Sequence, residues 1–405
     1  MHRARCLVID DEDDAKILMD RLGTHPKGLE IMAPKTIHLN IYLENIPNVH
    51  ANILKQEMLS IGGDACVRKD TIYGGSKEHT DVILMGNLKQ FRLLAKKLEI
   101  QPLGLKDIGL EILDSIRNFK NENKNAVTEL GKMKFEWGSR TYIMGILNLT
   151  PDSFSGDGIT DLNKAVERAK KMVEEGADII DIGGESSRPG AQPVPPNEEK
   201  KRVIPVIEKI AQELEGKTLI SIDTYKYEVA KEAVKKGAHI INDITGLSDP
   251  NMLSLALENN IPAVVMHMQG NPRTMQLSPS YSDVVKEIYD FLSQRVDIAT
   301  KKGMKKEKIW LDPGIGFGKN LEHNLTIIRR LKEFKSLGCP ILIGTSRKSF
   351  IGMTTGSAVS ERLEGSIASI SVAIANGADI VRVHDVKETK RAVNVCDAII
   401  RRRLR

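Results

Sequence analysis

The sequence predicts a closed parallel (β/α)8 (TIM) barrel preceded by a smaller α/β domain. Three observations lead to this fold. The chain has 405 residues, which is more than a single domain usually contains. Its last two thirds alternate short apolar runs with amphipathic stretches. Nearly every apolar run is followed by a residue that can form side-chain hydrogen bonds or carry charge. We therefore expect one large domain and one smaller one.

Residues 1–118 are predicted to form the small domain, with an antiparallel sheet. The stretch "TIHLNIYL" alternates like a strand, and "HANILKQEMLSIGG" has helical spacing and ends at glycines. The stretches "ACVRKDTIYG", "TDVILMG" and "LKQFRLLAKKLE" continue as strand, strand and helix. We expect a stabilising or dimerisation appendage, with a regulatory or substrate-channelling role as the alternative.

The opening "LVIDDEDDAKILMD" is faintly similar to a phosphoacceptor receiver domain. No aspartate occurs between Asp20 and Asp64, where such a domain needs its phosphorylated residue, so we reject that interpretation. The polar segment "FKNENKNAVTELGKMK" has the composition of a domain boundary. We place a linker at residues 119–135 and the large domain at residues 136–405.

Eight apolar runs in the large domain have the length of buried strands. They are residues 142–147, 179–182, 219–222, 240–241, 262–265, 309–311, 341–343 and 380–383. Helical stretches such as "LNKAVERAKKMVEEGAD" and "NEEKKRVIPVIEKIAQEL" separate them. Strand and helix alternating eight times are typical of a (β/α)8 barrel.

An open doubly wound sheet is the structural rival. The segment "DPGIGFGKN" supplies a glycine-rich turn after a strand, but its glycines lack the dinucleotide-binding spacing. Lys319 is followed by Asn rather than by Ser or Thr, so the segment is not a Walker loop either. We therefore favour the barrel.

Polar groups follow the predicted strands, and in a barrel such positions share one end of the fold. They are Asn148, residues 185–188, Asp223, Asn242, His267, Asp312, residues 346–348, Arg382 and His384. Any one of them alone could be a helix cap. Eight strands ending in this way indicate a binding site instead, although we expect His267 to be a structural residue at a strand end.

The residue types at these positions suit two kinds of chemical group. Hydrogen-bond donors that are cationic, or that become cationic when protonated, suit a phosphate. They are Arg188, Lys319, Lys348, Arg382 and His384. Acceptors and an amide suit the donor-rich edge of a flat heterocycle, and they are Asp223, Asn242 and Asp312. No nucleophile elbow or His and Cys metal cage occurs. A hard cation held by an Asn and by substrate phosphates remains open.

The net charge is only +5 and the basic residues are scattered, which argues against nucleic acid as a partner. No apolar run reaches about 18 residues, and the N-terminus turns acidic where a signal peptide would be apolar. We expect a cytoplasmic protein without a membrane partner. The four cysteines lie far apart, so neither a disulfide framework nor a zinc site is expected.

Eight segments of the large domain carry a resemblance to a known family. They read "MGILNLTPDSFS", "IIDIGGESSRPGA", "ISIDT", "AHIINDI", "MHMQGNPRTMQ", "LDPGIGFGKN", "SRKSFIG" and "RVHDVKET". From about Thr141 onward, the chain resembles dihydropteroate synthase, a pterin-binding barrel enzyme of folate biosynthesis. The resemblance implies condensation of 6-hydroxymethyl-7,8-dihydropterin diphosphate with p-aminobenzoate, which gives 7,8-dihydropteroate and pyrophosphate. It also implies a homodimer and a requirement for Mg2+.

The resemblance further implies a role for each matching residue. The pterin would be bound by Asp223, Asn242, Met266, Asp312 and Lys348. The diphosphate would be bound by Asn148, Arg382 and His384, with Asn148 also holding the metal. The aminobenzoate would be bound by Ser187, Arg188, Pro189, Phe317 and Ser346. The catalytic set would be Asn148, Lys348, Arg382 and His384.

The sequence departs from the family pattern at three places. Residues 155–158 read Ser-Gly-Asp-Gly where Ser-Asp-Gly-Gly is usual, which displaces Asp157 by one position. Ser187 replaces the usual Thr and Ile315 the usual Phe, both toward the aryl amine. Two alternatives therefore stay open. One is a synthase that uses a ribosylaminobenzene phosphate in methanopterin-type biosynthesis, and the other is a pterin-binding barrel without catalysis.

Overall fold

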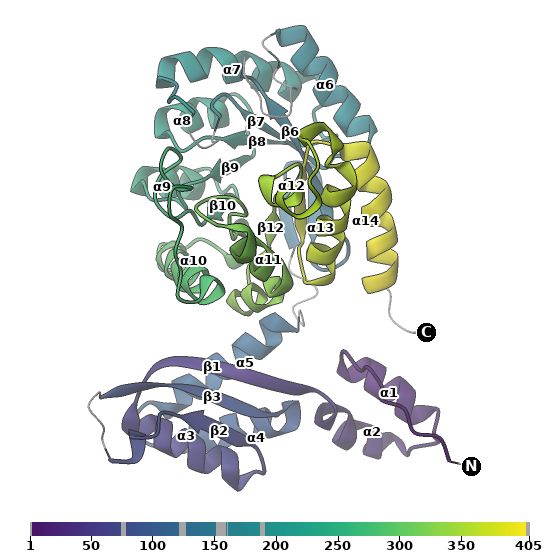
Figure 1. Ribbon diagram of the computed structural model, residues 1–405, viewed down its shortest axis with the longest axis vertical. Coiled ribbons are helices and arrows are strands. Elements are labelled where there is room, and N and C mark those ends of the chain that lie inside the picture. Colours follow the sequence, from purple (N-terminus) through teal and green to yellow (C-terminus); the bar gives the residue numbers. More distant parts are fainter. Residues whose placement is uncertain are drawn as a thin grey trace. The chain divides into compact units, whose positions relative to one another are not determined.

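The computed structural model describes residues 2–73, 78–120, 127–150, 159, 161–186 and 191–401. The chain divides into two compact units (Figure 1), of which the first reaches Lys120 and the second spans Asn121–Arg402. The first unit contains a three-stranded sheet. The second contains an eight-stranded sheet and a separate two-stranded hairpin.

The sheet of the first unit is antiparallel and has the strand order β1-β3-β2. Its strands are β1 (His38–Pro47), β2 (Asp64–Val67) and β3 (His79–Asn87). Its helices are α1 (Glu12–Asp20), α2 (Pro26–Met32), α3 (Asn48–Ser60), α4 (Leu88–Glu99) and α5 (Leu105–Phe119), with 3-10 turns at Ala33–Lys35 and Thr71–Tyr73. The predicted small α/β domain is confirmed, while α1, α2 and α5 are additional to the predicted elements.

Helices α3, α4 and α5 share one apolar core with the sheet of the first unit. Leu54, Phe91 and Ile112, one from each helix, are fully buried together with Leu84 of β3. Side chains alternate along a strand, so the preceding residue of β3, Ile83, faces away from this core and is exposed. One face of the sheet is therefore covered by helices.

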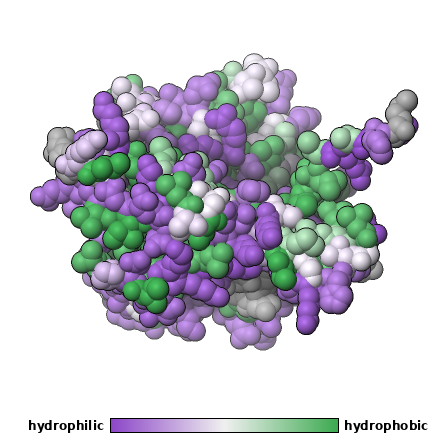
Figure 2. Space-filling view, turned by 90° about the horizontal axis from the view of Figure 1, so that it is seen from below, coloured by the Kyte–Doolittle hydropathy of each residue, from purple (hydrophilic) through white to green (hydrophobic). Residues whose placement is uncertain are grey.

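Hydrophobic and hydrophilic residues are interspersed on the face of the molecule drawn in Figure 2. Scattered exposed hydrophobic residues are normal on soluble surfaces and need no special function. Among the described residues, no helix combines the length and the apolar character that crossing a membrane requires.

The second unit is a parallel barrel with the strand order β11-β10-β9-β8-β7-β6-β13-β12. The strands are β6 (Tyr142–Asn148), β7 (Ile179–Gly183), β8 (Leu219–Asp223), β9 (Ile240–Asp243), β10 (Ala263–Met266), β11 (Ile309–Asp312), β12 (Leu342–Ile343) and β13 (Ile380–Val383). A parallel bridge between Leu311 and Ile341 joins the two ends of the sheet. The predicted (β/α)8 barrel is confirmed.

Helices surround this sheet in Figure 1. They are α6 (Leu162–Glu174), α7 (Pro196–Glu213), α8 (Tyr227–Lys235), α9 (Pro250–Glu258), α10 (Val284–Lys301), α11 (Leu321–Arg329), α12 (Ser349–Thr355), α13 (Leu363–Ala375) and α14 (Val386–Ile400), with 3-10 turns at Lys306–Lys308, Leu331–Leu337 and Val359–Glu361. Strand residues such as Ile180 and Ile222 point outward into the core that these helices cover. The inward-facing residues are thereby left to form the barrel interior.

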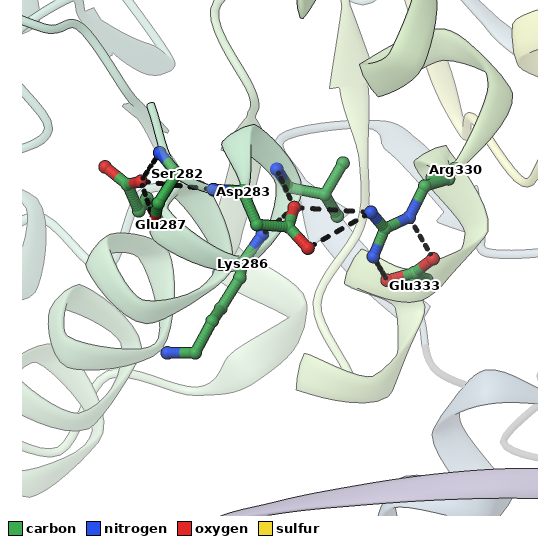
Figure 3. Close-up of polar contacts among 7 residues, drawn as sticks. Ser282, Asp283, Lys286, Glu287, Arg330 and Glu333 are labelled. Atoms are coloured by element: carbon green, nitrogen blue, oxygen red, sulfur yellow. Dashed lines mark hydrogen bonds and ion pairs between the residues drawn. The ribbon is translucent and has the colours of Figure 1, made fainter. Parts of the chain in front are cut away.

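The start of α10 is held by a network of polar contacts (Figure 3). Asp283 caps the helix by accepting from the backbone N–H groups of Val285 and Lys286 at 3.0 and 3.2 Å. Arg330, which follows α11, donates to Asp283 at 3.2 Å and to Glu333 at 2.7 Å. This network joins two neighbouring barrel helices.

An aromatic cluster closes the amino end of the barrel. The hairpin β4 (Val127–Leu130) and β5 (Met133–Glu136) carries Phe135, whose ring centroid lies 4.4 Å from that of Tyr142. Phe135 and Trp310 are completely buried in one cluster with the first inward residues of the strands. The predicted linker, residues 119–135, therefore overlaps a hairpin that packs into the barrel unit.

We expect Phe135→Ala to lower the free energy of unfolding of the barrel by about 3–5 kcal/mol, because it leaves a cavity in this cluster. The two tryptophans of the chain, Trp137 and Trp310, both lie in the cluster. Tryptophan fluorescence during urea unfolding will therefore report on the barrel. Leu277→Ala is the control, since Leu277 is 82% exposed. Equal unfolding midpoints for the two variants would contradict the assigned role.

Candidate active site

The carboxyl ends of the barrel strands bring the predicted polar residues together. Alternate residues of each strand face the interior, and the first inward residues form the apolar cluster described above. Above that layer, polar residues occupy the inward positions of five strands. They are Asp181, Ser221, Asn242, Asp312 and Arg382. A largely polar layer therefore lies next to the apolar cluster.

Arg382 is the central cation of this layer. Its Nε donates to Oδ2 of Asp181 and its Nη2 donates to Oδ2 of Asp223, both at 2.6 Å. Burial disfavours the charge on Arg382, but the two carboxylates outweigh it and raise its pKa. Burial raises the pKa of Asp223 to about 7, although Arg382 acts in the opposite direction. The arginine therefore stays cationic, while burial and the Arg382 cation act in opposite directions on the charge of Asp223.

Asn242 shares the same carboxylate. Its Nδ2 donates to Oδ2 of Asp181 at 3.0 Å, and both side chains are buried. Sequence reasoning missed Asp181. The available signal was a lone carboxylate within the apolar run 179–182, two residues after the inward-facing Ile179.

Asp312 and Lys348 are two further ionisable groups of the site, and each influences the charge state of the other. Asp312 is 6% exposed and accepts from the backbone N–H of Gly314 at 2.7 Å. Burial raises the pKa of Asp312, while Lys348 opposes that shift. Burial lowers the pKa of Lys348 to about 8, against the effect of Asp312. Lys348 donates to the carbonyl of Ile315, and its Nζ lies 4.9 Å from the centre of the Phe317 ring.

Lys319 and His267 make a contact beneath the loops that follow β10 and β11. Nζ of Lys319 lies 3.0 Å from Nδ1 of His267 and donates to the carbonyl of Phe317 at 2.9 Å. Burial lowers the pKa of Lys319 to about 7. Burial, aided by Lys319, lowers the pKa of His267 to about 3. Neutral His267 can accept from Lys319, so this pair joins the two loops.

Four further predicted residues lie at strand ends or on the loops that follow them. Nδ1 of His384 lies 3.0 Å from Oγ of Ser346, which is buried. Asn148 ends β6 and is half-buried, and its backbone carbonyl accepts from Ile159. Met266 ends β10 and is 4% exposed.

The remaining predicted residues, Ser187, Arg188 and Pro189, lie outside the described residues, as does Asp157. The described segments beside residues 187–190 are tied together. Oε2 of Glu185 accepts from the backbone N–H of Val194 at 2.8 Å.

Lys226 links the same two segments and also binds a second carboxylate, that of Glu199. It donates to Glu185, to the Val194 carbonyl at 2.6 Å and to Glu199, which is 1% exposed. Oε1 of Glu185 accepts from the hydroxyl of Tyr225 at 2.9 Å. Sequence reasoning named Glu185 as a residue at a strand end but missed its partners Glu199, Tyr225 and Lys226, because they are distant along the chain.

The arrangement can bind a flat heterocycle rich in N–H groups beside an anion. Buried carboxylates supply acceptors, and Arg382 keeps its Nη1 donors unpaired among the described residues. In the part of the chain that the structure describes, no group of three or more His, Cys, Asp or Glu side chains could hold a metal.

Comparisons with known proteins agree with this chemistry. The family model described as pterin binding enzyme matches residues 144–384. A dihydropteroate synthase from Escherichia coli K12 is 51% identical over 263 residues, which cover 65% of this chain and 93% of that protein. A dihydropteroate synthase structure from Clostridium difficile, obtained in the presence of pteroic acid, has 50% identity and a TM-score of 0.61, covering 66% of this chain and 100% of that one.

One relative also matches the first unit. A probable bifunctional folylpolyglutamate synthase/dihydropteroate synthase from Haloferax volcanii is 39% identical over 396 residues, which cover 95% of this chain. The match covers 46% of that relative, so this chain spans less than half of its length.

We expect the His267 side chain to stay neutral between pH 5 and 8, because its pKa is lowered to about 3. The folded protein then binds fewer protons than the unfolded chain between about pH 3 and 6.5, so this residue lowers stability as the pH falls through that window. NMR of 15N-histidine-labelled protein measures the titration, and His267→Gln assigns the signal. A midpoint near pH 6.5 would refute the buried contact.

Proposed function

This chain belongs to the dihydropteroate synthase family of pterin binding enzymes, and on that premise we propose the reaction that it catalyses. It condenses 6-hydroxymethyl-7,8-dihydropterin diphosphate with p-aminobenzoate, giving 7,8-dihydropteroate and pyrophosphate. The observation that carries this proposal is the buried polar layer, in which carboxylate acceptors lie beside Arg382. The same end of the barrel can thus hold a heterocycle and its diphosphate.

The pterin is proposed to bind against Asp223, Asn242, Met266, Asp312 and Lys348. Asp312 presents a carboxylate that can accept two hydrogen bonds from the guanidine-like edge of the ring. Its own contact is a single backbone N–H, so it keeps acceptor capacity for the ligand. Met266 offers a soft apolar surface to the ring.

The diphosphate is proposed to bind to Arg382, His384 and Asn148. Arg382 keeps its charge and its Nη1 donors, which suit phosphate oxygens. Asn148 offers an amide oxygen, and Mg2+ commonly takes few protein ligands when phosphates supply others. This donor set fits Mg2+ held jointly by Asn148 and the diphosphate. When bound, the metal neutralises charge on the leaving group.

The aryl amine is proposed to bind to Ser187, Arg188, Pro189, Phe317 and Ser346. Loss of pyrophosphate leaves a cation that is delocalised into the dihydropterin, so a neutral aniline can attack without a strong base. Asn148, Lys348, Arg382 and His384 form the proposed catalytic set. They bind, orient and balance charge at the leaving group.

Neither alternative is favoured by the relatives. The related curated proteins and the solved structure carry the dihydropteroate synthase name, alone or as one half of a bifunctional protein. A pterin module without catalysis would not need the diphosphate donors Arg382 and His384. We further propose a cytoplasmic homodimer, with residues 1–118 as an appended domain and 136–405 as the barrel, joined by residues 119–135, of which the part from Val127 onward belongs to the hairpin.

The acceptor assay tests the proposed function directly. With dihydropterin diphosphate and Mg2+, we expect pyrophosphate release to require p-aminobenzoate. Release should be about 100-fold slower or more with an aminobenzene that carries a ribosyl phosphate, because a site built for a carboxylate discriminates strongly. A mixture without amine measures background hydrolysis. No turnover with p-aminobenzoate would sink the proposal, and faster turnover with the ribosyl phosphate would favour the methanopterin-type alternative.

Asp312→Asn is expected to weaken pterin binding by about 100-fold or more, because one charged acceptor becomes a donor. Calorimetry with 6-hydroxymethyl-7,8-dihydropterin measures the affinity. The matched control is Asp379→Asn, which alters a buried carboxylate that pairs with Lys335 at the amino end of β13. Similar affinity losses in both variants would show that Asp312 acts through stability rather than through contact.

A further inference from the structure

Asp181 is a buried carboxylate that serves two parts of the proposed site at once. Its Oδ2 accepts from Nδ2 of Asn242 at 3.0 Å and from Nε of Arg382 at 2.6 Å. Asn242 belongs to the proposed pterin side, and Arg382 to the diphosphate side. No other carboxylate among the described residues contacts both side chains.

The contact with Asp181 determines which group Asn242 can offer to a ligand. An ionised carboxylate only accepts hydrogen bonds, so the amide nitrogen of Asn242 must face Asp181. The carboxylate thereby fixes the orientation of the Asn242 amide. Asn242 is left with its Oδ1 as an acceptor, which suits an N–H group of the pterin.

Asp181 also sets the plane of the Arg382 guanidinium. Nε and Nη2 lie along one edge of that planar group, and Asp181 and Asp223 each accept from one of them. Two such contacts leave the guanidinium little freedom to rotate. Nη1 remains available for phosphate oxygens.

The remaining oxygen of Asp181 argues against a purely structural role. Among the described residues, Oδ1 of Asp181 is fully buried without a hydrogen-bond partner. The same holds for Oγ of Ser221, the paired residue on β8. A buried charge that is only partly satisfied contributes little net stability compared with an apolar residue. Positioning Asn242 and Arg382 accounts better for a carboxylate here.

We propose that Asp181 is a positioning residue that couples the pterin half of the site to the diphosphate half. It orients Asn242 as an acceptor and aims Arg382 at the leaving group through one shared oxygen. The inference rests on the proposed function and adds a residue that touches neither substrate in that assignment.

The test uses Asp181→Asn in the full chain and two ligands, 6-hydroxymethyl-7,8-dihydropterin and its diphosphate. Affinity for the pterin alcohol should fall about tenfold through the disturbed Asn242. The ratio of the affinity for the diphosphate to the affinity for the alcohol should itself fall about tenfold, because Arg382 is no longer held in place. We also expect a lower kcat, with KM for p-aminobenzoate nearly unchanged.

The matched control is Asp178→Asn, which makes the same change just before β7. Asp178 pairs with Arg140 at 2.7 Å, and it lies at the opposite end of the barrel from the site. It should lower stability without changing the affinity ratio. Urea unfolding followed by tryptophan fluorescence identifies any variant that fails to fold, and Asp181→Ser then replaces Asp181→Asn in the binding measurements.

Several results would overturn the inference. One is a folded Asp181 variant whose ratio of diphosphate affinity to alcohol affinity is unchanged. Another is a variant in which only one of these two affinities falls.

Equal effects of the Asp178 and Asp181 substitutions would show that both residues act through stability. Failure of both Asp181 variants to fold would make the carboxylate a structural requirement. Failure of the proposed function is separate, because the wild-type chain would then release no pyrophosphate.

Discussion

The ion pairs of Arg382 with the buried Asp181 and the half-buried Asp223 are the interaction on which the proposed site depends. Three groups that can carry charge lie inside the barrel, where an unpaired charge is costly, and the two ion pairs offset that cost. Arg382 holds Asp181 and Asp223 in place, and they hold the guanidinium at the carboxyl ends of the strands. The position of the cation follows from strand register, since β13 carries it inward beside β6 and its neighbour β7.

The apolar layer beneath this cluster makes the electrostatics strong. Aromatic rings from the hairpin and from β11 fill the amino end of the barrel, where Phe135 and Trp310 are completely buried. Charges above such a layer are shielded from water on one side, which strengthens their attraction and raises the cost of leaving them unpaired. The aromatic cluster that stabilises the amino end of the barrel thus also strengthens the electrostatic interactions in the polar layer at the carboxyl end.

The direction of the pKa shifts indicates what a ligand would contribute. Burial raises the pKa values of Asp223 and Asp312 and lowers that of Lys348. Each shift moves the group toward its neutral form. Hydrogen bonds from the N–H groups of a pterin would favour the ionised forms of Asp223 and Asp312, and an anionic diphosphate nearby would favour the cationic form of Lys348. Substrate binding and charge in this layer are therefore linked.

The barrel, its eight strands and the polar residues at their ends could be predicted from the sequence, because strand periodicity and strand-helix alternation are local properties. Asp312 and Arg382 could be named from such positions alone. Their contact partners became visible only in the folded chain. Asp181 contacts Arg382 across 201 positions of sequence, and the hairpin beginning at Val127, a segment with the polar composition of a linker, packs into the barrel. Those contacts depend on barrel closure and strand register, which bring residues that are distant in sequence to the same depth in the barrel interior. No local sequence pattern predicts them.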